Sequence, residues 1–166
     1  MLDDPTAARP LVSVEKLRVE FDTNDGVVVG VEDVSFAIRP GETVCVVGES
    51  GSGKSVTSLS LMRLVQYGGG KIAGGKLMFT RESGETVDLS QAGPSLMRTI
   101  RGNEIGMIFQ EPMTSLNPVF TVERQLMEGL RVHKGMSKEA ARERALDLMR
   151  QVRIPEPERR LKQHPH

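Results

Sequence analysis

Eight consecutive residues carry the clearest chemistry in this sequence. They fit the pattern G-x-x-x-x-G-K-[ST] in full and are Gly48, Glu49, Ser50, Gly51, Ser52, Gly53, Lys54 and Ser55. Glycines at fixed positions let backbone N–H groups wrap closely around an anion, because no Cβ stands in the way. A helix that starts at the end of the loop adds the positive end of its dipole. The spacing therefore predicts a triphosphate-binding loop in which Lys54 contacts the β- and γ-phosphates and Ser55 binds Mg²⁺.

The segments on either side of this loop have the composition that a strand–loop–helix unit requires. Residues 43–47 are apolar and mostly β-branched, which predicts a strand buried on both faces of a parallel sheet. Residues 56–65 are apolar nearly all round and predict a buried helix. A chance Gly/Ser loop would lack this context. Neither N-K-x-D nor D-x-x-G occurs in the chain, which argues against a GTPase.

Upstream of the loop the sequence predicts a flexible lead and then a β layer. Residues 1–10 contain two prolines and no periodicity. Residues 11–38 predict an antiparallel layer with one buried face, because apolar and polar residues alternate on either side of a turn signal, Asn24-Asp25-Gly26. The alternation is imperfect in residues 11–21.

Downstream of residue 65 the sequence predicts a loop, two short strands and three helices. The five glycines of residues 66–76 predict the loop. The strands are expected at residues 77–80 and 105–109, and the helices at residues 95–101 and after the N-cap residues Thr121 and Ser137.

The overall composition excludes several classes of function. The 166 residues include 22 acidic and 22 basic side chains, so no net charge attracts nucleic acid or anionic lipid. Aromatic residues make up 4% of the chain, too few for a base-stacking platform. No apolar run approaches the length of about 18 residues that spans a bilayer. The one cysteine, Cys45, is expected to be a small buried hydrophobe.

A second motif narrows the family. Residues 105–118 read IGMIFQEPMTSLNP, an apolar strand that ends in glutamine and runs into a proline-broken loop. This stretch resembles the Q-loop of ABC ATPases. The SLNP continuation and the spelling GESGSGKSVT at residues 48–57 resemble the ATPase subunits of oligopeptide, dipeptide and nickel importers, and the longer stretch at residues 107–121 resembles those of glutathione importers. The resemblance covers about residues 12–166 and implies an α/β fold, the P-loop NTPase core of an ABC ATPase with an N-terminal antiparallel β layer and the start of a helical subdomain.

The resemblance implies roles for individual residues. Gln110 would contact Mg²⁺ and the water that attacks ATP, which makes it the expected catalytic residue; the plainer alternative is that it only ends a strand. The loop at residues 111–119, from Glu111 to Val119, would contact the permease in the membrane. Phe21 would stack on adenine, and its alternative role is ordinary core burial. The expected cofactors are ATP and Mg²⁺.

The sequence departs from the family pattern near its end. It finishes at Pro165-His166, where importer subunits continue into the LSGG signature; LSGG, a Walker B run with its catalytic Glu, and the switch histidine are all absent. We therefore expect residues 11–166 to form an incomplete nucleotide-binding domain truncated before the signature motif. Its expected parts are a β layer, a P-loop and Q-loop part, and the start of the helical subdomain, at residues 11–38, 39–119 and 120–166.

Three functions remain open at this point. The first is the N-terminal part of an ATP-binding subunit of a peptide or glutathione importer at the cytoplasmic face of the bacterial inner membrane. Its partners would be permease subunits, a second ATP-binding subunit and, indirectly, a periplasmic binding protein, with no nucleic acid. The second is an ATP-binding fragment without turnover. The third, a small-molecule kinase, is disfavoured by the Q-loop-like stretch. The transported solute cannot be read from this chain.

Overall fold

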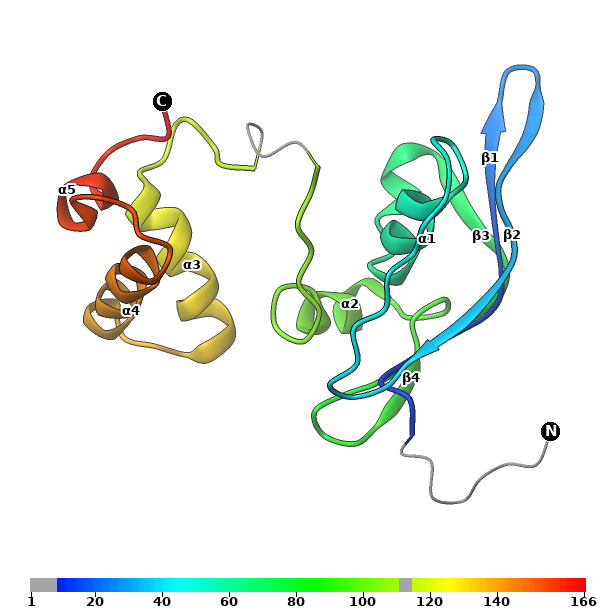
Figure 1. Cartoon of the computed structure of the whole chain (residues 1–166), viewed down its shortest axis with the longest axis horizontal. Helices are drawn as coiled ribbons and strands as arrows, with labels where there is room; N and C mark the ends of the chain where they lie inside the picture. The colour runs from blue at the N-terminus through cyan, green and yellow to red at the C-terminus, as the bar shows by residue number, and fades with distance from the viewer. Residues whose placement is uncertain (1–8, 111–114) are drawn as a thin grey trace. The chain divides into compact units, whose positions relative to one another are not determined.

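The computed structural model describes residues 9–110 and 115–166. The chain forms two compact units, which divide between Glu104 and Ile105 (Figure 1). The first unit contains a four-stranded sheet and the helices that lie on it, and the second consists of helices.

The sheet of the first unit is antiparallel throughout. Its strand order is β2-β1-β3-β4, so the first two strands form a hairpin and the third strand returns to the free edge of the first. This arrangement confirms the β layer predicted at residues 11–38 and the turn signal Asn24-Asp25-Gly26, since the chain turns at Asn24 and Asp25 and β2 begins at Gly26. The strands are β1 (Val12–Thr23), β2 (Gly26–Ile38), β3 (Gly70–Thr80) and β4 (Thr86–Asp88).

A β-bulge in β1 explains the imperfect alternation of the sequence. The pairing of β1 with β2 shifts between Val14 and Leu17, so the strand carries one residue more than strict alternation allows. Lys16 adopts a left-handed φ of 47° there. Because of the shift, both Val14 and Leu17 are buried although their numbers differ in parity. The bulge thus keeps one face of β1 in the core along its whole length.

The prediction of a loop at residues 66–76 is wrong. These residues form a short 3-10 helix, η1 (Val65–Gly68), and the first half of β3. Glycine in this strand serves close packing, since a Cβ on Gly75 would lie 2.5 Å from the carbonyl oxygens of Glu15 and Lys16 on β1. Pairing with β1 therefore outweighs the weak strand propensity of glycine.

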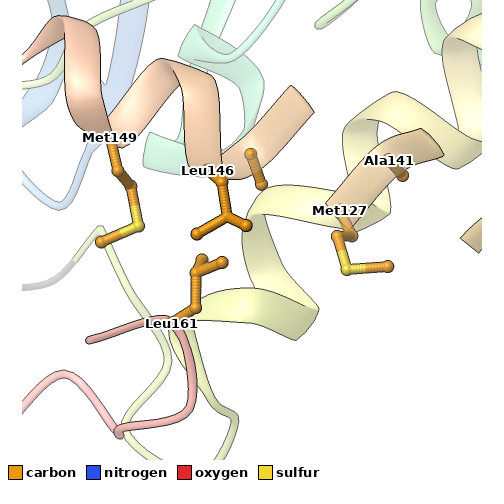
Figure 2. Packing of buried hydrophobic residues seen from close by; sticks show 6 residues of the cluster. Met127, Ala141, Leu146, Met149 and Leu161 are labelled. Carbon is orange, nitrogen blue, oxygen red and sulfur yellow. The ribbon is translucent and has the colours of Figure 1, made fainter. Parts of the chain in front are cut away.

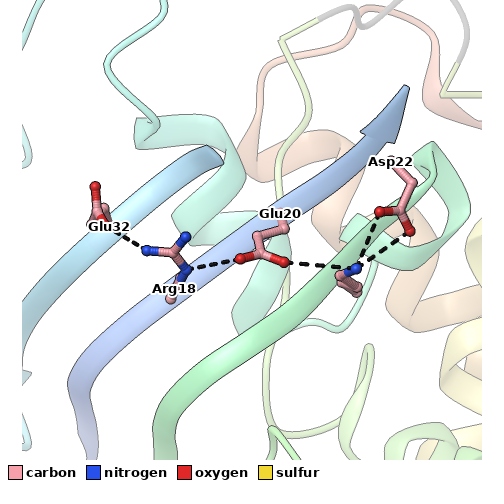
Figure 3. Close-up of polar contacts among 5 residues, drawn as sticks. Arg18, Glu20, Asp22 and Glu32 are labelled. Atoms are coloured by element: carbon pink, nitrogen blue, oxygen red, sulfur yellow. Dashed lines mark hydrogen bonds and ion pairs between the residues drawn. The ribbon is translucent and has the colours of Figure 1, made fainter. Parts of the chain in front are cut away.

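Charged side chains alternate in sign across the outer face of the sheet (Figure 3). Arg18 of β1 forms ion pairs with Glu32 of β2 and, at 2.9 Å, with Glu20. Lys71 of β3 continues the row with contacts of 3.6 Å to Glu20 and 3.1 Å to Asp22. These exposed pairs raise the pKa of Lys71 mainly through the hydrogen bond to Asp22. The row links three strands and contributes modestly to their stability.

The prediction of a strand at residues 43–47 is also wrong. A strand exists only through hydrogen bonds to a neighbour, and within residues 9–110 and 115–166 none pairs with this segment. Val46 is 54% exposed and Val47 is 85% exposed. Cys45 is exposed as well, so its predicted burial is not observed. The segment leads without regular structure into helix α1 (Lys54–Leu61), and α2 (Pro94–Ile100) follows later in the first unit.

The second unit buries a small helical core (Figure 2). Its helices are α3 (Val122–Lys134), α4 (Lys138–Gln151) and α5 (Pro157–Leu161). The predicted N-caps are confirmed, because the side chains of Thr121 and Ser137 accept hydrogen bonds from Arg124 N and Ala140 N. The core consists of Met127, Ala141, Ala145, Leu146, Met149 and Leu161.

The buried strand predicted at residues 105–109 is not formed. Ile108 is 98% exposed and Phe109 is 53% exposed, and residues 106–109 have no regular structure. The reason is the same as for residues 43–47, since no described strand pairs with them. Among the described helices, none has the length and apolar character needed to cross a membrane.

Candidate phosphate-binding site

The loop at residues 48–53 leads directly into the N-terminus of α1. Helix α1 begins at Lys54, directly after the N-cap residue Gly53, which has a φ of 84°. None of the described side chains caps this helix end, and no acidic residue lies in its first turn. The first N–H groups of a helix have no partner within the helix, so those of α1 remain available to an anion.

The ammonium of Lys54 lies against the beginning of the loop. Its Nζ donates to the carbonyl oxygens of Gly48 at 2.8 Å and Glu49 at 2.6 Å, and to the hydroxyl of Ser52 at 3.2 Å. The side chain is therefore held across the loop by carbonyl groups. A positive charge and uncapped backbone N–H groups thus belong to the same short segment, as phosphate binding requires.

Two glycines of the motif have close neighbours, and at Gly53 the neighbour is backbone, so no larger residue fits there. A Cβ on Gly53 would lie 2.7 Å from the carbonyl oxygen of Gly30 on β2 and 3.0 Å from Val31. A Cβ on Gly48 would lie 2.7 Å from the hydroxyl of Ser52. The loop is therefore packed against the β layer by backbone, and the positive φ of Gly53 adds a second reason for glycine there.

The two hydroxyl residues that follow Lys54 have different surroundings. Ser55 is exposed in the first turn of α1. Thr57 is buried, and both its backbone N–H and its hydroxyl donate to the carbonyl oxygen of Gly53, at 2.8 and 2.9 Å. Thr57 thereby fixes the turn from which the loop enters the helix. Within the described ranges, no three His, Cys, Asp or Glu side chains form a metal cluster.

Phe21 of β1 is linked to this loop by Gly30 of the neighbouring strand β2. Its half-buried ring packs on Gly30 of β2 and Gly70 of β3, because a Cβ on either glycine would lie 2.6 or 2.7 Å from a ring carbon. Gly30 is also the residue whose carbonyl oxygen meets Gly53. The structure therefore connects the predicted aromatic residue to the predicted loop through one glycine of β2.

The other predicted residues belong to the second unit. Gln110 is exposed, and residues 111–114 of the predicted permease loop lie outside the described residues. The rest of this loop is fastened to α3 by Gln125, whose amide accepts from Asn117 N at 2.7 Å and donates to Asn117 O at 2.9 Å and Phe120 O at 3.0 Å. Arg124 lies 3.8 Å above the ring centroid of Phe120. The loop after residue 115 is thus ordered by side chains of the helix that follows it.

Comparison with protein families decides among the classes of P-loop proteins. A model described as ABC transporter matches residues 31–166, most of the chain. The chain belongs to the ABC transporter family. The resemblance drawn from residues 48–57 and 105–118 is therefore confirmed, and an unrelated small-molecule kinase is excluded.

Relatives of this ABC transporter chain carry the names of import proteins. It is 52% identical over 158 residues to a Brucella abortus (strain 2308) protein that bears the name of a peptide import ATP-binding protein, covering 95% of this chain and 47% of that protein. It is 45% identical over 163 residues to the glutathione import ATP-binding protein GsiA of Escherichia coli (strain K12), covering 98% of this chain and 26% of GsiA. The chain thus spans about half the length of the first relative and about a quarter of the second.

The fold is that of an ATP-binding cassette. The structure matches the ATP-binding cassette MJ0796, solved as a dimer in a post-hydrolysis state bound to ADP and Pi, with a TM-score of 0.76. The match covers 93% of this chain and 61% of that chain at 23% sequence identity. The predicted fold class, the N-terminal part of a P-loop ABC ATPase, is confirmed.

Several residues of the site escaped sequence analysis. Gly30 and Gly70 stand in segments that carry no phosphate-binding pattern, and their importance appears only when the ring of Phe21 is placed. Gln125 is one of several polar residues on α3, and nothing in its position distinguishes it. Thr57 lies two residues beyond the motif, and its spacing of four residues from Gly53, one helical turn, is the signal that could have revealed it.

Proposed function

We propose that this chain supplies the ATP-binding portion of an ATP-binding subunit in an ABC importer of peptides or glutathione. The observation that carries the proposal is the combination at residues 48–55 of an uncapped helix N-terminus with the Lys54 ammonium held across the loop. Both features attract the same kind of ligand, a polyphosphate anion.

The residues of the loop would divide the work of binding. Backbone N–H groups at the start of α1 would receive phosphate oxygens, and Lys54 would exchange its carbonyl contacts for the more strongly charged β- and γ-phosphates. The exposed Ser55 hydroxyl would hold Mg²⁺, which neutralises phosphate charge when bound. Gln110, also exposed, would contact the metal ion and the attacking water. The half-buried ring of Phe21 would stack on adenine.

The choice of importer rests on the relatives. Their names refer to import of peptides and of glutathione, and the chain aligns with both groups over nearly its whole length. We extend from them the partners of the proposed subunit, which are permease subunits contacted through residues 111–119, a second ATP-binding subunit and indirectly a periplasmic binding protein. The proposed location is the cytoplasmic face of the bacterial inner membrane.

Nucleotide binding tests the core of the proposal. The affinity of the chain for MgATP is measured by titration calorimetry for the parent, for Lys54→Ala and for Lys162→Ala, an exposed lysine of the second unit. We expect the Lys54 variant to lose at least about tenfold in affinity, because a charge-assisted contact to phosphate is worth more than about 1.4 kcal/mol. Lys162→Ala should bind as the parent does. Equal MgATP affinity in a folded Lys54→Ala variant would refute the proposed site.

A measurement of ATP hydrolysis separates the two functions that remain, part of an importer ATPase and an ATP-binding fragment without turnover. The sequence contains no Walker B carboxylates to polarise the attacking water, which favours binding without hydrolysis by this chain alone. We expect phosphate release from MgATP to be no faster than with Lys54→Ala. Hydrolysis by the parent that Lys54→Ala abolishes would instead assign complete catalysis to these residues.

Exchange of homologous segments tests the importer assignment. The 163 matching residues of E. coli GsiA are replaced by the corresponding residues of this chain, and uptake of labelled glutathione is measured in cells that lack GsiA. Uptake by the chimera that is abolished by Lys54→Ala supports the assignment. A chimera that is expressed, folded and binds ATP but gives no uptake argues against a glutathione importer and leaves peptide import.

A further inference from the structure

The structure assigns Gly30 and Gly70 as positioning residues that hold the Phe21 ring at a fixed place beside the phosphate-binding loop. The assignment rests on the proposed ATP site. It adds two residues that determine where the ring that stacks on adenine lies. Neither glycine belongs to the loop motif, and neither has a positive φ that would by itself demand glycine.

The ring of Phe21 is held at two of its carbons by two different strands. A Cβ on Gly30 of β2 would lie 2.6 Å from Cε2, and a Cβ on Gly70 of β3 would lie 2.7 Å from Cε1 and 2.6 Å from Cγ2 of Val65. Gly70 is also the direct cross-strand partner of Phe21. Opposite edges of the ring therefore face the two glycines, and a side chain at either position would need the space that the ring occupies. The ring nevertheless remains half-buried, so part of its surface stays open.

Gly30 is the extra residue of a β-bulge in β2. The adjacent residues Val19 and Glu20 of β1 pair with Val31 and Val29 of β2, which leaves Gly30 between them without a partner on β1. Bulges change the direction of the backbone locally and are frequent beside functional sites. Here the carbonyl oxygen of the bulged residue lies 2.7 Å from the Cβ position of Gly53.

One residue therefore touches both parts of the proposed site. On its Cα side Gly30 accepts the Phe21 ring, and through its carbonyl group it meets the last glycine of the loop. The separation between the aromatic ring and the phosphate-binding loop is set by this residue. A methyl group at position 30 would displace the ring and leave the loop sequence intact. It should therefore weaken binding of the adenine base more than binding of the phosphates.

The experiment compares a ligand that has a base with one that lacks it. Affinities for MgATP and for magnesium tripolyphosphate are measured for the parent, Gly30→Ala, Gly70→Ala and Phe21→Leu. Gly68→Ala is the control, because a Cβ there meets no atom within 4 Å and its φ is ordinary. For the three test variants we expect a loss of about tenfold for ATP and no change for tripolyphosphate, as removal of one stacking contact would give. The control should match the parent with both ligands.

A second comparison keeps the inference testable if Gly30→Ala is unstable. In the double variant Phe21→Leu/Gly30→Ala the smaller side chain makes room for the methyl group, so the midpoint of thermal unfolding should recover toward that of Phe21→Leu. Its ATP affinity should equal that of Phe21→Leu, because the glycine acts through the ring. An additional loss in ATP affinity on adding Gly30→Ala to Phe21→Leu would overturn the assignment.

Two further outcomes have distinct meanings. If Phe21→Leu binds ATP as well as the parent does, the ring belongs only to the core and the positioning role is refuted, while ATP binding that depends on Lys54 still supports the proposed function. If the parent binds neither ATP nor tripolyphosphate, the proposed function itself fails and the positioning role fails with it.

Discussion

Glu104 is held by Arg81 through two hydrogen bonds, of 2.9 Å from Nε and 2.7 Å from Nη2, with 5% of the Glu104 side chain exposed. The second carboxylate oxygen accepts from Glu82 N at 3.1 Å. The pair ties the turn after α2 to the end of β3, and so fixes the last residue of the first unit. The Arg81 hydrogen bonds, followed by the bond from Glu82 N, hold the pKa of Glu104 below its ordinary value.

This lowered pKa predicts an acid-sensitive first unit. A carboxyl group whose pKa is lower when folded than when unfolded adds stability above its unfolded pKa, and that stability disappears as pH falls through the folded pKa. The free energy of unfolding, measured in urea from pH 7 to pH 3, should therefore fall in acid for the parent. Glu104→Gln should be less stable at pH 7 and lose less below pH 4.5. Glu82→Gln, a neighbour with an exposed side chain, should follow the parent; identical pH profiles for parent and Glu104→Gln would contradict the role of the pair.

Gly53→Ala is expected to damage both the loop and the fold. The substitution forces alanine to a φ of 84° and places its Cβ 2.7 Å from the carbonyl oxygen of Gly30. Left-handed backbone alone costs about 1–2 kcal/mol, and the contact adds to it. Urea unfolding should show a loss of about 2 kcal/mol or more, with weaker MgATP binding. Gly68→Ala is the matched control, and equal stability of the two variants would show that the loop relaxes freely.

Gln125→Ala is expected to release the loop that precedes α3. The amide of Gln125 makes three hydrogen bonds to the backbone of Asn117 and Phe120, and alanine makes none of them. Hydrogen exchange of the Asn117 amide should accelerate by at least about tenfold, because its acceptor is lost. Gln151→Ala, at the exposed end of α4, should leave that exchange rate unchanged. Unaltered protection of Asn117 in Gln125→Ala would mean that this contact does not order the loop.

Leu161→Ala is expected to undock α5 from the second unit. Leu161 is fully buried against the cluster formed by α3 and α4 (Figure 2), so its truncation should cost about 2–4 kcal/mol in the free energy of unfolding. The amide of Val122 donates to Gln163 O at 2.9 Å, and its hydrogen exchange should accelerate in the variant. Val152→Ala, at a site 68% exposed, should change stability by less than about 0.5 kcal/mol. A similar small effect of Leu161→Ala would show that α5 contributes little.

The sequence predicted features that local interactions determine. The motif at residues 48–55 predicts a phosphate-binding loop by itself, because glycine, lysine and serine at this spacing are specific for that structure. The hairpin of β1 and β2 and the N-caps Thr121 and Ser137 are likewise local, and all are present. Gln110 and its assigned role remain a prediction.

Features that depend on distant partners could not be predicted. Residues 43–47 have strand composition, yet a strand needs a neighbour that the described residues do not provide. The glycines of residues 66–76 suggested a loop because their partner, the bulged strand β1, lies about 50 residues earlier in the chain. Gly30 matters because of Phe21 and Gly53, which a pattern within β2 cannot reveal.

The extra residue at Lys16 bends β1 locally and does not decide which residues pair further along the strand. Deleting it would restore simple alternation from Val14 onward, and the apolar row would still face inward. The rest of the strand would keep its pairing with β3, because Leu17 would then face Gly75 between the existing pairs Glu15–Lys76 and Arg18–Gly74, and Phe21 would still lie opposite Gly70. A shortened strand would thus keep its aromatic ring in place and would lose the local bend, together with the close approach of the Lys16 carbonyl group to Gly75.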